Sequence, residues 1–275
     1  MTDNELQLDL TGENIVLTGG AGVLCGVMAE ALAERGAAVA LLDIDEEMAE
    51  KKACAIRDAG GDAVAVICNV LDREDLEHAR TLVKEAIGTP TVLINGAGGN
   101  KSDATTGPDK EFFDLPADAV EWVFNLNFVG TFLASQVFGE EMALGEGGNI
   151  INISSMNAFR PLTKIPAYSG AKAAVSNFTQ WLAVHMSQNY KPVVRVNAIA
   201  PGFFLTNQNR FLLMDEETED LTPRGSTIID HTPMGRFGDP EELVGTILWL
   251  LSDSSKFVHG IVVPIDGGFS AFSGV

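Results

Sequence analysis

The feature that most constrains this 275-residue sequence is a regular alternation of short apolar runs with longer amphipathic stretches. The apolar runs have the length of buried strands and cover residues 14–19, 37–43, 63–69, 91–96, 149–154, 193–201 and 260–266. The stretches between them have helical spacing and cover residues 25–35, 46–59, 72–87, 120–144, 167–187 and 240–251. Strands that alternate with helices form a parallel sheet covered on both faces. We therefore predict one α/β domain over residues 1–275, with a doubly wound parallel sheet of about seven strands.

One segment interrupts this alternation. Residues 203–232 form a long insertion between the sixth and seventh expected strands and mix aromatic, acidic and turn-forming residues. Loops of this length in a compact α/β domain are usually functional or mobile. Because the segment follows the carboxyl end of a strand, where such sheets bind ligands, we predict that it forms a lid over a substrate. Its acidic run, residues 215–220, is expected to be a solvated surface.

The charge balance excludes several classes of partner. The chain has 18 basic and 38 acidic residues and a net charge of −20, which would repel nucleic acid and anionic membranes. This excess favours solubility, and adaptation to a high-salt host is the alternative. Three irregularly spaced cysteines predict neither a disulfide framework nor a metal site. With no export signal and no long apolar run, the expected location is the cytoplasm.

The turn after the first expected strand has the composition of a phosphate-binding loop. It reads TGGAGVLCG over residues 18–26 and leads into a helix, whose N-terminal N–H groups attract an anion. The second expected strand ends in Asp43. A carboxylate there can accept both ribose hydroxyls of NAD and would repel the 2′-phosphate of NADP, so NADH is the expected cofactor of this Rossmann-type fold. The alternative role for Asp43 is that of a helix N-cap or turn residue.

Two further strand ends are expected to face the same cofactor. The segment CNV, residues 68–70, follows the third expected strand and could meet the adenine. The segment NGAG, residues 95–98, ends the fourth expected strand and could face the ribose. Each segment alone is only a turn signal.

The densest chemistry lies in residues 154–172. Tyr168 and Lys172 are four residues apart near the start of an expected helix, so their side chains share one face. A nearby ammonium group, together with a positive nicotinamide ring, would stabilise the phenolate of Tyr168 and let it exchange a proton near neutral pH. Ser155 follows the preceding strand and could hydrogen-bond the substrate oxygen.

Several motifs follow one another along the chain: the glycine turn, Asp43, NGAG, Ser155, Tyr168, Lys172, NAIAPG at 197–202 and DGG at 266–268. In this order they resemble a classical short-chain dehydrogenase/reductase over nearly the whole chain. The resemblance implies an enzyme that acts on CH–OH groups and assembles as a homotetramer. It implies that Tyr168 is the general acid and base, that Lys172 lowers its pKa and binds ribose, and that Asn127 holds a water molecule. The cofactor-binding residues it implies are Gly19, Gly20, Gly22, Val23, Leu24, Asp43, Asn69, Val70, Asn95, Gly96, Ala97, Tyr168, Lys172, Pro201, Gly202, Phe204 and Thr206.

The sequence also departs from the usual pattern of that family. The common form TGxxxGxG has glycines where this chain has Val23 and Cys25, and the usual NNAG has asparagine where this chain has Gly96. The aspartate often found before Val70 is Asn69. These departures concern the contacts that hold the phosphates.

Longer stretches, including ISSMNAFRPLTKIPAYSGAK and APGFFLTNQNR, resemble the D-mannonate oxidoreductase (fructuronate reductase) subgroup. This resemblance implies reversible hydride transfer between NAD(H) and a sugar acid. A sugar acid needs a cation and several polar partners; the candidates are Asn100, Asn157, Arg160, Lys164, Gln208, Arg210 and His231. Arg160 and Lys164 are the best candidates for its carboxylate, although either could instead pair with a surface acid. The alternatives are another carbonyl reductase, acting on a gluconate or polyol, and a non-catalytic NAD-binding protein.

Overall fold

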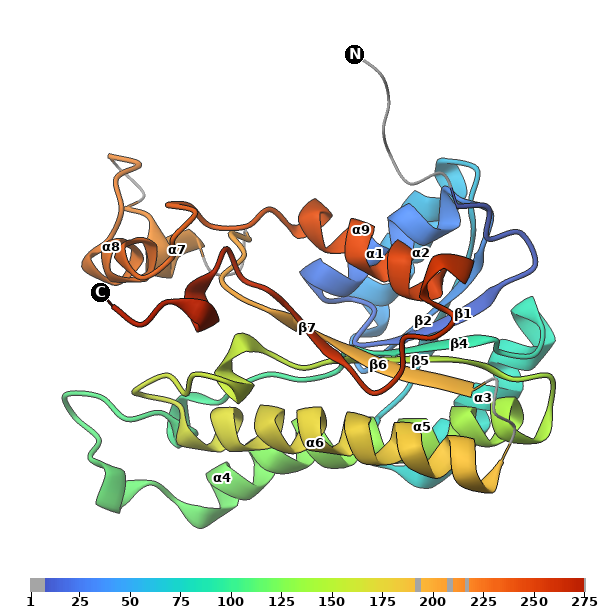
Figure 1. The fold of residues 1–275 in the computed structure, drawn as a ribbon, viewed down its shortest axis with the longest axis horizontal. Helices are drawn as coiled ribbons and strands as arrows, with labels where there is room; N and C mark the ends of the chain where they lie inside the picture. Colours follow the sequence, from blue (N-terminus) through green and yellow to red (C-terminus); the bar gives the residue numbers. More distant parts are fainter. Residues whose placement is uncertain (1–7, 191–193, 207–209, 216–217, 275) are drawn as a thin grey trace.

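The computed structural model describes residues 8–190, 194–206, 210–215 and 218–274 (Figure 1). Its strands form one parallel sheet in the order β3-β2-β1-β4-β5-β6-β7. Each expected apolar run became a strand, which confirms the predicted doubly wound sheet. The strands are β1 (Asn14–Thr18), β2 (Ala38–Asp43), β3 (Asp62–Ile67), β4 (Val92–Asn95), β5 (Gly148–Ile153), β6 (Val194–Pro201) and β7 (Val262–Ile265).

Helices cover both faces of the sheet (Figure 1). The apolar faces of α1, α2 and α9 pack against one side, and those of α3, α5 and α6 against the other. Because both faces are covered, most of the sheet is buried and reads in the sequence as continuous apolar runs. The helices are α1 (Val23–Ala33), α2 (Glu46–Asp58), α3 (Arg73–Ile87), α4 (Ala117–Phe124), α5 (Gly130–Leu144), α6 (Pro166–Asn189), α7 (Arg210–Leu213), α8 (Pro223–Asp230) and α9 (Val244–Leu251). None of the helices in the described ranges is long and apolar enough to cross a membrane.

Local sequence signals fix where several helices begin. The side chains of Asp45 and Asp72 accept hydrogen bonds from backbone N–H groups in the first turns of α2 and α3. The expected helix over residues 240–251 begins at Pro240 with Asp239 as its N-cap, although its first turn is a 3₁₀ helix that runs into α9. There the Glu242 carboxylate accepts from the Asp239 N–H at 2.9 Å.

The helix expected over residues 120–144 is not continuous. A π-helical turn, Asn125–Val129, separates α4 from α5. A π turn inserts one extra residue into the helix and changes the direction of the side chains that follow. Asn127, one of the predicted site residues, lies within this turn and is fully buried.

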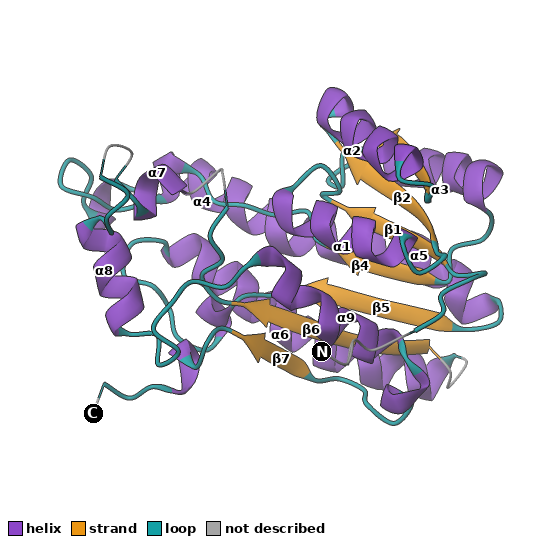
Figure 2. Ribbon diagram, turned by 90° about the horizontal axis from the view of Figure 1, so that it is seen from above, coloured by secondary structure: helices purple, strands orange, loops and turns teal. Residues whose placement is uncertain are grey.

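The described residues within 203–232 include the short helices α7 and α8. Together with the C-terminal end, they lie beyond the carboxyl ends of β6 and β7 (Figure 2). The strand order reverses between β1 and β4, so the carboxyl ends of these strands leave a crevice beside the same edge of the sheet. The expected lid is therefore at the end of the molecule where such sheets bind their ligands, and its role as a lid stays a prediction.

Candidate active site

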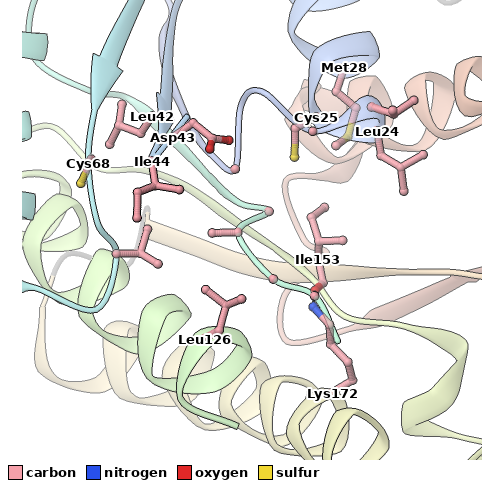
Figure 3. A pocket seen from close by; sticks show the side chains of 18 of the residues that line it. Leu24, Cys25, Met28, Leu42, Asp43, Ile44, Cys68, Leu126, Ile153 and Lys172 are labelled. Carbon is pink, nitrogen blue, oxygen red and sulfur yellow. The ribbon is translucent and has the colours of Figure 1, made fainter. Parts of the chain in front are cut away.

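A cavity of about 380 Å³ opens at the carboxyl ends of β1, β2, β3 and β4. Asp43 lies near one end of it and Lys172 near the other, with Leu126 and Ile153 between them (Figure 3). The predicted site residues that line it are Gly19, Gly22, Val23, Leu24, Asp43, Asn69, Val70, Gly96, Ala97, Tyr168 and Lys172. The fold thus brings most of the predicted cofactor residues to one cavity.

The glycine turn has the geometry that a phosphate-binding loop requires. Gly19 has a φ of +68°, and a Cβ there would lie 2.8 Å from the Ala97 backbone, so a larger residue would separate the first and fourth strand ends. α1 starts after Gly22 without a side-chain cap. Its first N–H groups can therefore bind an anion. Gly20 has another role, because a Cβ there would lie 2.8 Å from Leu41 Cα in β2.

Asp43 lines the cavity at the end of β2. Its Oδ2 accepts from the Ala21 N–H at 2.9 Å, and its Oδ1 accepts from the Asp45 N–H at 3.1 Å. The helix N-cap is Asp45, whose side chain accepts from Met48, so the N-cap alternative for Asp43 is wrong. The carboxylate instead ties the glycine turn to β2, and each oxygen retains a lone pair for a ligand hydroxyl.

Asn95 differs from its predicted neighbours because its side chain points into the protein interior. It is 1% exposed and donates hydrogen bonds to Ser135 Oγ at 2.9 Å and Asn152 Oδ1 at 2.8 Å. Asn152 in turn donates to Thr179 Oγ1 at 2.9 Å. These buried bonds join β4, β5, α5 and α6, whereas Asn95 Oδ1 is buried without a hydrogen-bond partner in the described part of the chain. The predicted contact of Asn95 with a cofactor stays a prediction.

Asn127 holds the turn that follows β4. Its Nδ2 donates to Gly99 O at 2.7 Å and Val123 O at 2.8 Å, and its Oδ1 accepts from the Gly99 N–H at 3.2 Å. A Cβ on Gly98 would lie 2.5 Å from Asn127 Oδ1 and 3.3 Å from Lys172 Nζ. Only glycine therefore lets both side chains approach the turn. Both Nδ2 protons are used in these bonds, so a water molecule would have to bind through an acceptor of Asn127.

Tyr168 and Lys172 share one face of α6, as their spacing predicts. Lys172 is 4% exposed, its Nζ donates to Ile153 O at 2.8 Å, and it lies 5.6 Å from the centroid of the Tyr168 ring. Burial lowers the pKa of Lys172 to about 8. The neutral and charged forms of the lysine are thus close in free energy near neutral pH.

The pKa of Tyr168 differs from the sequence-based expectation. Burial raises the pKa of the phenol above its ordinary value, and the hydrogen bond with Ser155 offsets part of this effect. Desolvation is the larger of the two effects, so the net shift is upward, and Lys172 Nζ donates its hydrogen bond to Ile153 O. The phenol is protonated at neutral pH and can donate its proton.

The four predicted residues at the end of β6 and beyond it lie outside this cavity. The Gly202 N–H donates to Ile265 O at 2.8 Å, and a Cβ on Gly202 would lie 2.6 Å from Asp266 Cα. Phe204 is buried and packs under Gly238, where it lines a second cavity of about 190 Å³. Pro201 is buried in β6, and Thr206 is half-buried. Their predicted contacts with a cofactor therefore stay predictions.

Two predicted substrate residues, Arg160 and His231, each contact the C-terminal tail, residues 266–274. Arg160 Nε donates to Ser270 O at 3.1 Å. The ring centroid of Phe269 lies 6.4 Å from that of His231. The tail thus connects the loop before α6 with the end of α8, an association that no sequence pattern indicated.

Asn100 and Lys164 lie on two loops that hydrogen-bond to each other. The Thr106 N–H donates to Lys164 O at 2.9 Å, and Asn100 Nδ2 donates to Thr105 Oγ1 at 2.7 Å. Asn157 is 6% exposed, and its Oδ1 has no hydrogen-bond partner in the described part of the chain. An unsatisfied buried oxygen is costly unless a ligand or water supplies a donor.

The remaining substrate candidates lie in the 203–232 segment. Arg210 forms an ion pair with Glu219 at 3.4 Å, and Gln208 lies outside the described residues. None of the described substrate candidates lines the cavity that holds Tyr168 and Lys172. Within the described ranges, no group of histidine, cysteine and acidic residues could hold a metal ion.

Sequence reasoning missed several cavity residues. Gly99 adjoins the predicted segment NGAG, so its place after a strand end could have indicated it. Ile199 and Leu243 come from distant parts of the chain, and no local signal marks them. Cys68 and Gly98 lie within the predicted segments CNV and NGAG; the missed residues are Cys25, Met28, Leu42, Ile44, Gly99, Leu126, Ile153, Ile199 and Leu243.

Comparisons with known proteins agree with this geometry. A family model described as enoyl-(acyl carrier protein) reductase matches residues 24–270. The chain belongs to the short-chain dehydrogenase/reductase family. It is an oxidoreductase that acts on alcohol or ketone groups.

Three relatives are informative about this short-chain dehydrogenase/reductase. A Haemophilus influenzae structure with bound NAD, provisionally named D-mannonate oxidoreductase, is 51% identical, has a TM-score of 0.90 and covers 96% of this chain and 98% of its own. The Escherichia coli 5-keto-D-gluconate 5-reductase is 32% identical, covering 94% of this chain and 96% of its own. A Burkholderia cenocepacia gluconate 5-dehydrogenase, in complex with NADP and tartrate, is 28% identical with a TM-score of 0.83, covering 96% and 97%.

Proposed function

We propose that this enzyme interconverts a hydroxyl and a ketone of a sugar acid, D-mannonate and D-fructuronate, with NAD(H) as its cofactor. The observation that carries the proposal is the position of Tyr168 and Lys172 at the inner end of a cavity whose other end holds Asp43. A dinucleotide that spans such a cavity supplies or accepts a hydride at its nicotinamide. The protein must then supply or accept the proton.

Tyr168 is the proton donor in this proposal. Its raised pKa keeps the phenol protonated at neutral pH, so in the reducing direction it can give its proton to the ketone oxygen. Ser155 hydrogen-bonds to Tyr168 and would orient the same oxygen. The buried ammonium of Lys172 would stabilise the phenolate left after the transfer.

The preference for NADH is proposed from the charge at the end of β2. Asp43 lines the cavity, and its carboxylate would accept ribose hydroxyls but repel a 2′-phosphate. The NAD-bound Haemophilus influenzae relative supports this choice. The relative that binds NADP is less similar to this chain.

The sugar acid is proposed from the relatives and from polar residues around the C-terminal tail. Arg160 has no acidic partner in the described ranges, and only its Nε hydrogen-bonds to the tail. Its terminal nitrogens could bind a carboxylate bidentately. The buried, unsatisfied Oδ1 of Asn157 could accept a bond from a sugar hydroxyl. Action in the cytoplasm and assembly as a homotetramer remain parts of the proposal.

The test is NADH oxidation with a matched set of keto acids. D-Fructuronate should give the highest kcat/KM, and 5-keto-D-gluconate should give the next highest. Arg160→Met should raise KM for the sugar acid while KM for NADH stays unchanged. If 5-keto-D-gluconate is the better substrate, the enzyme is a gluconate 5-dehydrogenase, the second candidate that a relative favours. Absence of turnover with every hexuronate would exclude the first assignment.

A further inference from the structure

Two departures from the family pattern lie in contact. Cys25 stands where the resemblance implies a glycine, and Gly96 stands where it implies asparagine. A Cβ on Gly96 would overlap Cys25 Sγ and would also lie 2.9 Å from Thr18 O. Cys25 is 5% exposed, and its Sγ donates to the same Thr18 O at 3.7 Å. The thiol thus fills the space that a side chain at position 96 would need.

We propose that Cys25 and Gly96 are a complementary packing pair that positions the turn after β4 against α1 and so sets the shape of the cofactor cavity. Both residues line that cavity, and in Figure 3 the Cys25 sulfur points away from α1 toward its interior. The proposal rests on the assignment of this cavity to a dinucleotide. Cys25 is a positioning residue in it, with no covalent chemistry.

The contact connects the two ends of the site. Gly96 begins the turn in which Gly98 makes room for Lys172 Nζ and for Asn127 Oδ1. Asn127 is hydrogen-bonded to the next residue of the turn on both its N–H and its carbonyl. A shift of this turn away from α1 would therefore move the phosphate end and the catalytic end of the cavity together.

The chemistry of the thiol suits this role. Burial is the main reason that the pKa of Cys25 is raised to about 12, so the group stays neutral. A neutral buried cysteine packs as a small apolar side chain. Interiors have few spaces into which an extra methyl group can fit, so a Cβ at position 96 requires a smaller residue at position 25.

A double-mutant cycle tests the pair. Gly96→Ala alone should weaken NADH binding about tenfold, because overpacking by one methyl group costs about 1–3 kcal/mol. Cys25→Ala removes only the sulfur, and the new Cβ at position 96 would then lie 3.8 Å from the Cβ at position 25, an ordinary contact. The contact of the new Cβ with Thr18 O at 2.9 Å remains, so the double variant should recover part of the affinity that Gly96→Ala loses and bind NADH more tightly than that single variant.

The kinetic readout separates positioning from general damage. In Gly96→Ala, KM for NADH should rise about tenfold, while kcat at saturating NADH should change less than KM does. Gly99→Ala is the matched control from the same turn, since a Cβ there meets nothing within 4 Å. The effect of Gly99→Ala on KM for NADH should be the same in the wild type and in the Cys25→Ala background. Additive effects of Cys25→Ala and Gly96→Ala on NADH binding would overturn the proposal.

Thermal unfolding without cofactor keeps the test independent of the proposed function. Gly96→Ala should lower the Tm, and adding Cys25→Ala should recover part of the loss, because the 2.9 Å contact with Thr18 O remains. If Gly96→Ala fails to fold and the double variant folds, the pair is supported. If both fail to fold, or if their Tm losses add, the pair is refuted. A wild type that binds no NADH would refute the cofactor assignment. The Tm values of the two single variants and the double variant would still test the packing pair.

Discussion

Lys172→Met should change how the stability of this enzyme depends on pH. Burial lowers the pKa of Lys172 from 10.5 in the unfolded chain to about 8 in the folded protein. Since one pKa unit corresponds to about 1.4 kcal/mol, the charged lysine costs the folded state about 3 kcal/mol. This penalty is complete below pH 8, where both states hold the proton. It fades between pH 8 and 10.5, where only the unfolded chain keeps its proton.

The variant removes that pH dependence. As pH rises from 8 to 10.5, the free energy of unfolding of the wild type should increase by about 3 kcal/mol relative to Lys172→Met. At neutral pH the gain in the variant is partly offset, because Ile153 O loses its hydrogen bond from Nζ, at a cost of about 1–3 kcal/mol. The test is therefore the difference between the wild type and Lys172→Met in how steeply the free energy of unfolding changes with pH.

Urea unfolding at a series of pH values measures the slope. Both proteins are compared at one protein concentration and without cofactor, since association and ligands would shift the midpoint. Lys256→Met is the control for loss of a lysine, because the Lys256 side chain is 71% exposed. Its curve should run parallel to that of the wild type. Parallel curves for Lys172→Met and the wild type between pH 8 and 10.5 would refute the burial argument.

Three further substitutions test the site. Tyr168→Phe keeps the ring but removes the proton donor, so kcat for ketone reduction should fall about 10²–10⁴-fold while NADH affinity, followed by fluorescence, stays near the wild-type value. Gly98→Ala should lower kcat and shift the pH profile of kcat, because the new Cβ would lie 2.5 Å from Asn127 Oδ1 and 3.3 Å from Lys172 Nζ. An unchanged pH profile of kcat would contradict this expectation. In the wild type, kcat/KM with NADH should exceed kcat/KM with NADPH by more than about tenfold, a difference of about 1.4 kcal/mol. Asp43→Asn should reduce this ratio, because it removes the carboxylate that would repel the 2′-phosphate. Equal rates with both cofactors in the wild type would remove the role given to Asp43.

Local sequence patterns determined the elements and much of the site. The apolar runs predicted every strand because a strand buried on both faces has no alternation to obscure it. The four-residue spacing of Tyr168 and Lys172 placed both on one helix face, and Asp43 followed from its place at the end of a strand. Each of these inferences concerns residues within one element or at its end.

The tertiary structure decided which distant residues meet. Asn95 and Asn152 join neighbouring strands through a buried bond, and Arg160 reaches the C-terminal tail. The pKa of Tyr168 rises because burial outweighs the hydrogen bond with Ser155, and burial is a property of the packed fold. The resemblance in sequence marked Cys25 and Gly96 as unusual positions, and the packing showed that they touch. Periodicity encodes contacts within a helix or strand, whereas contacts between elements depend on volumes that only close packing fixes.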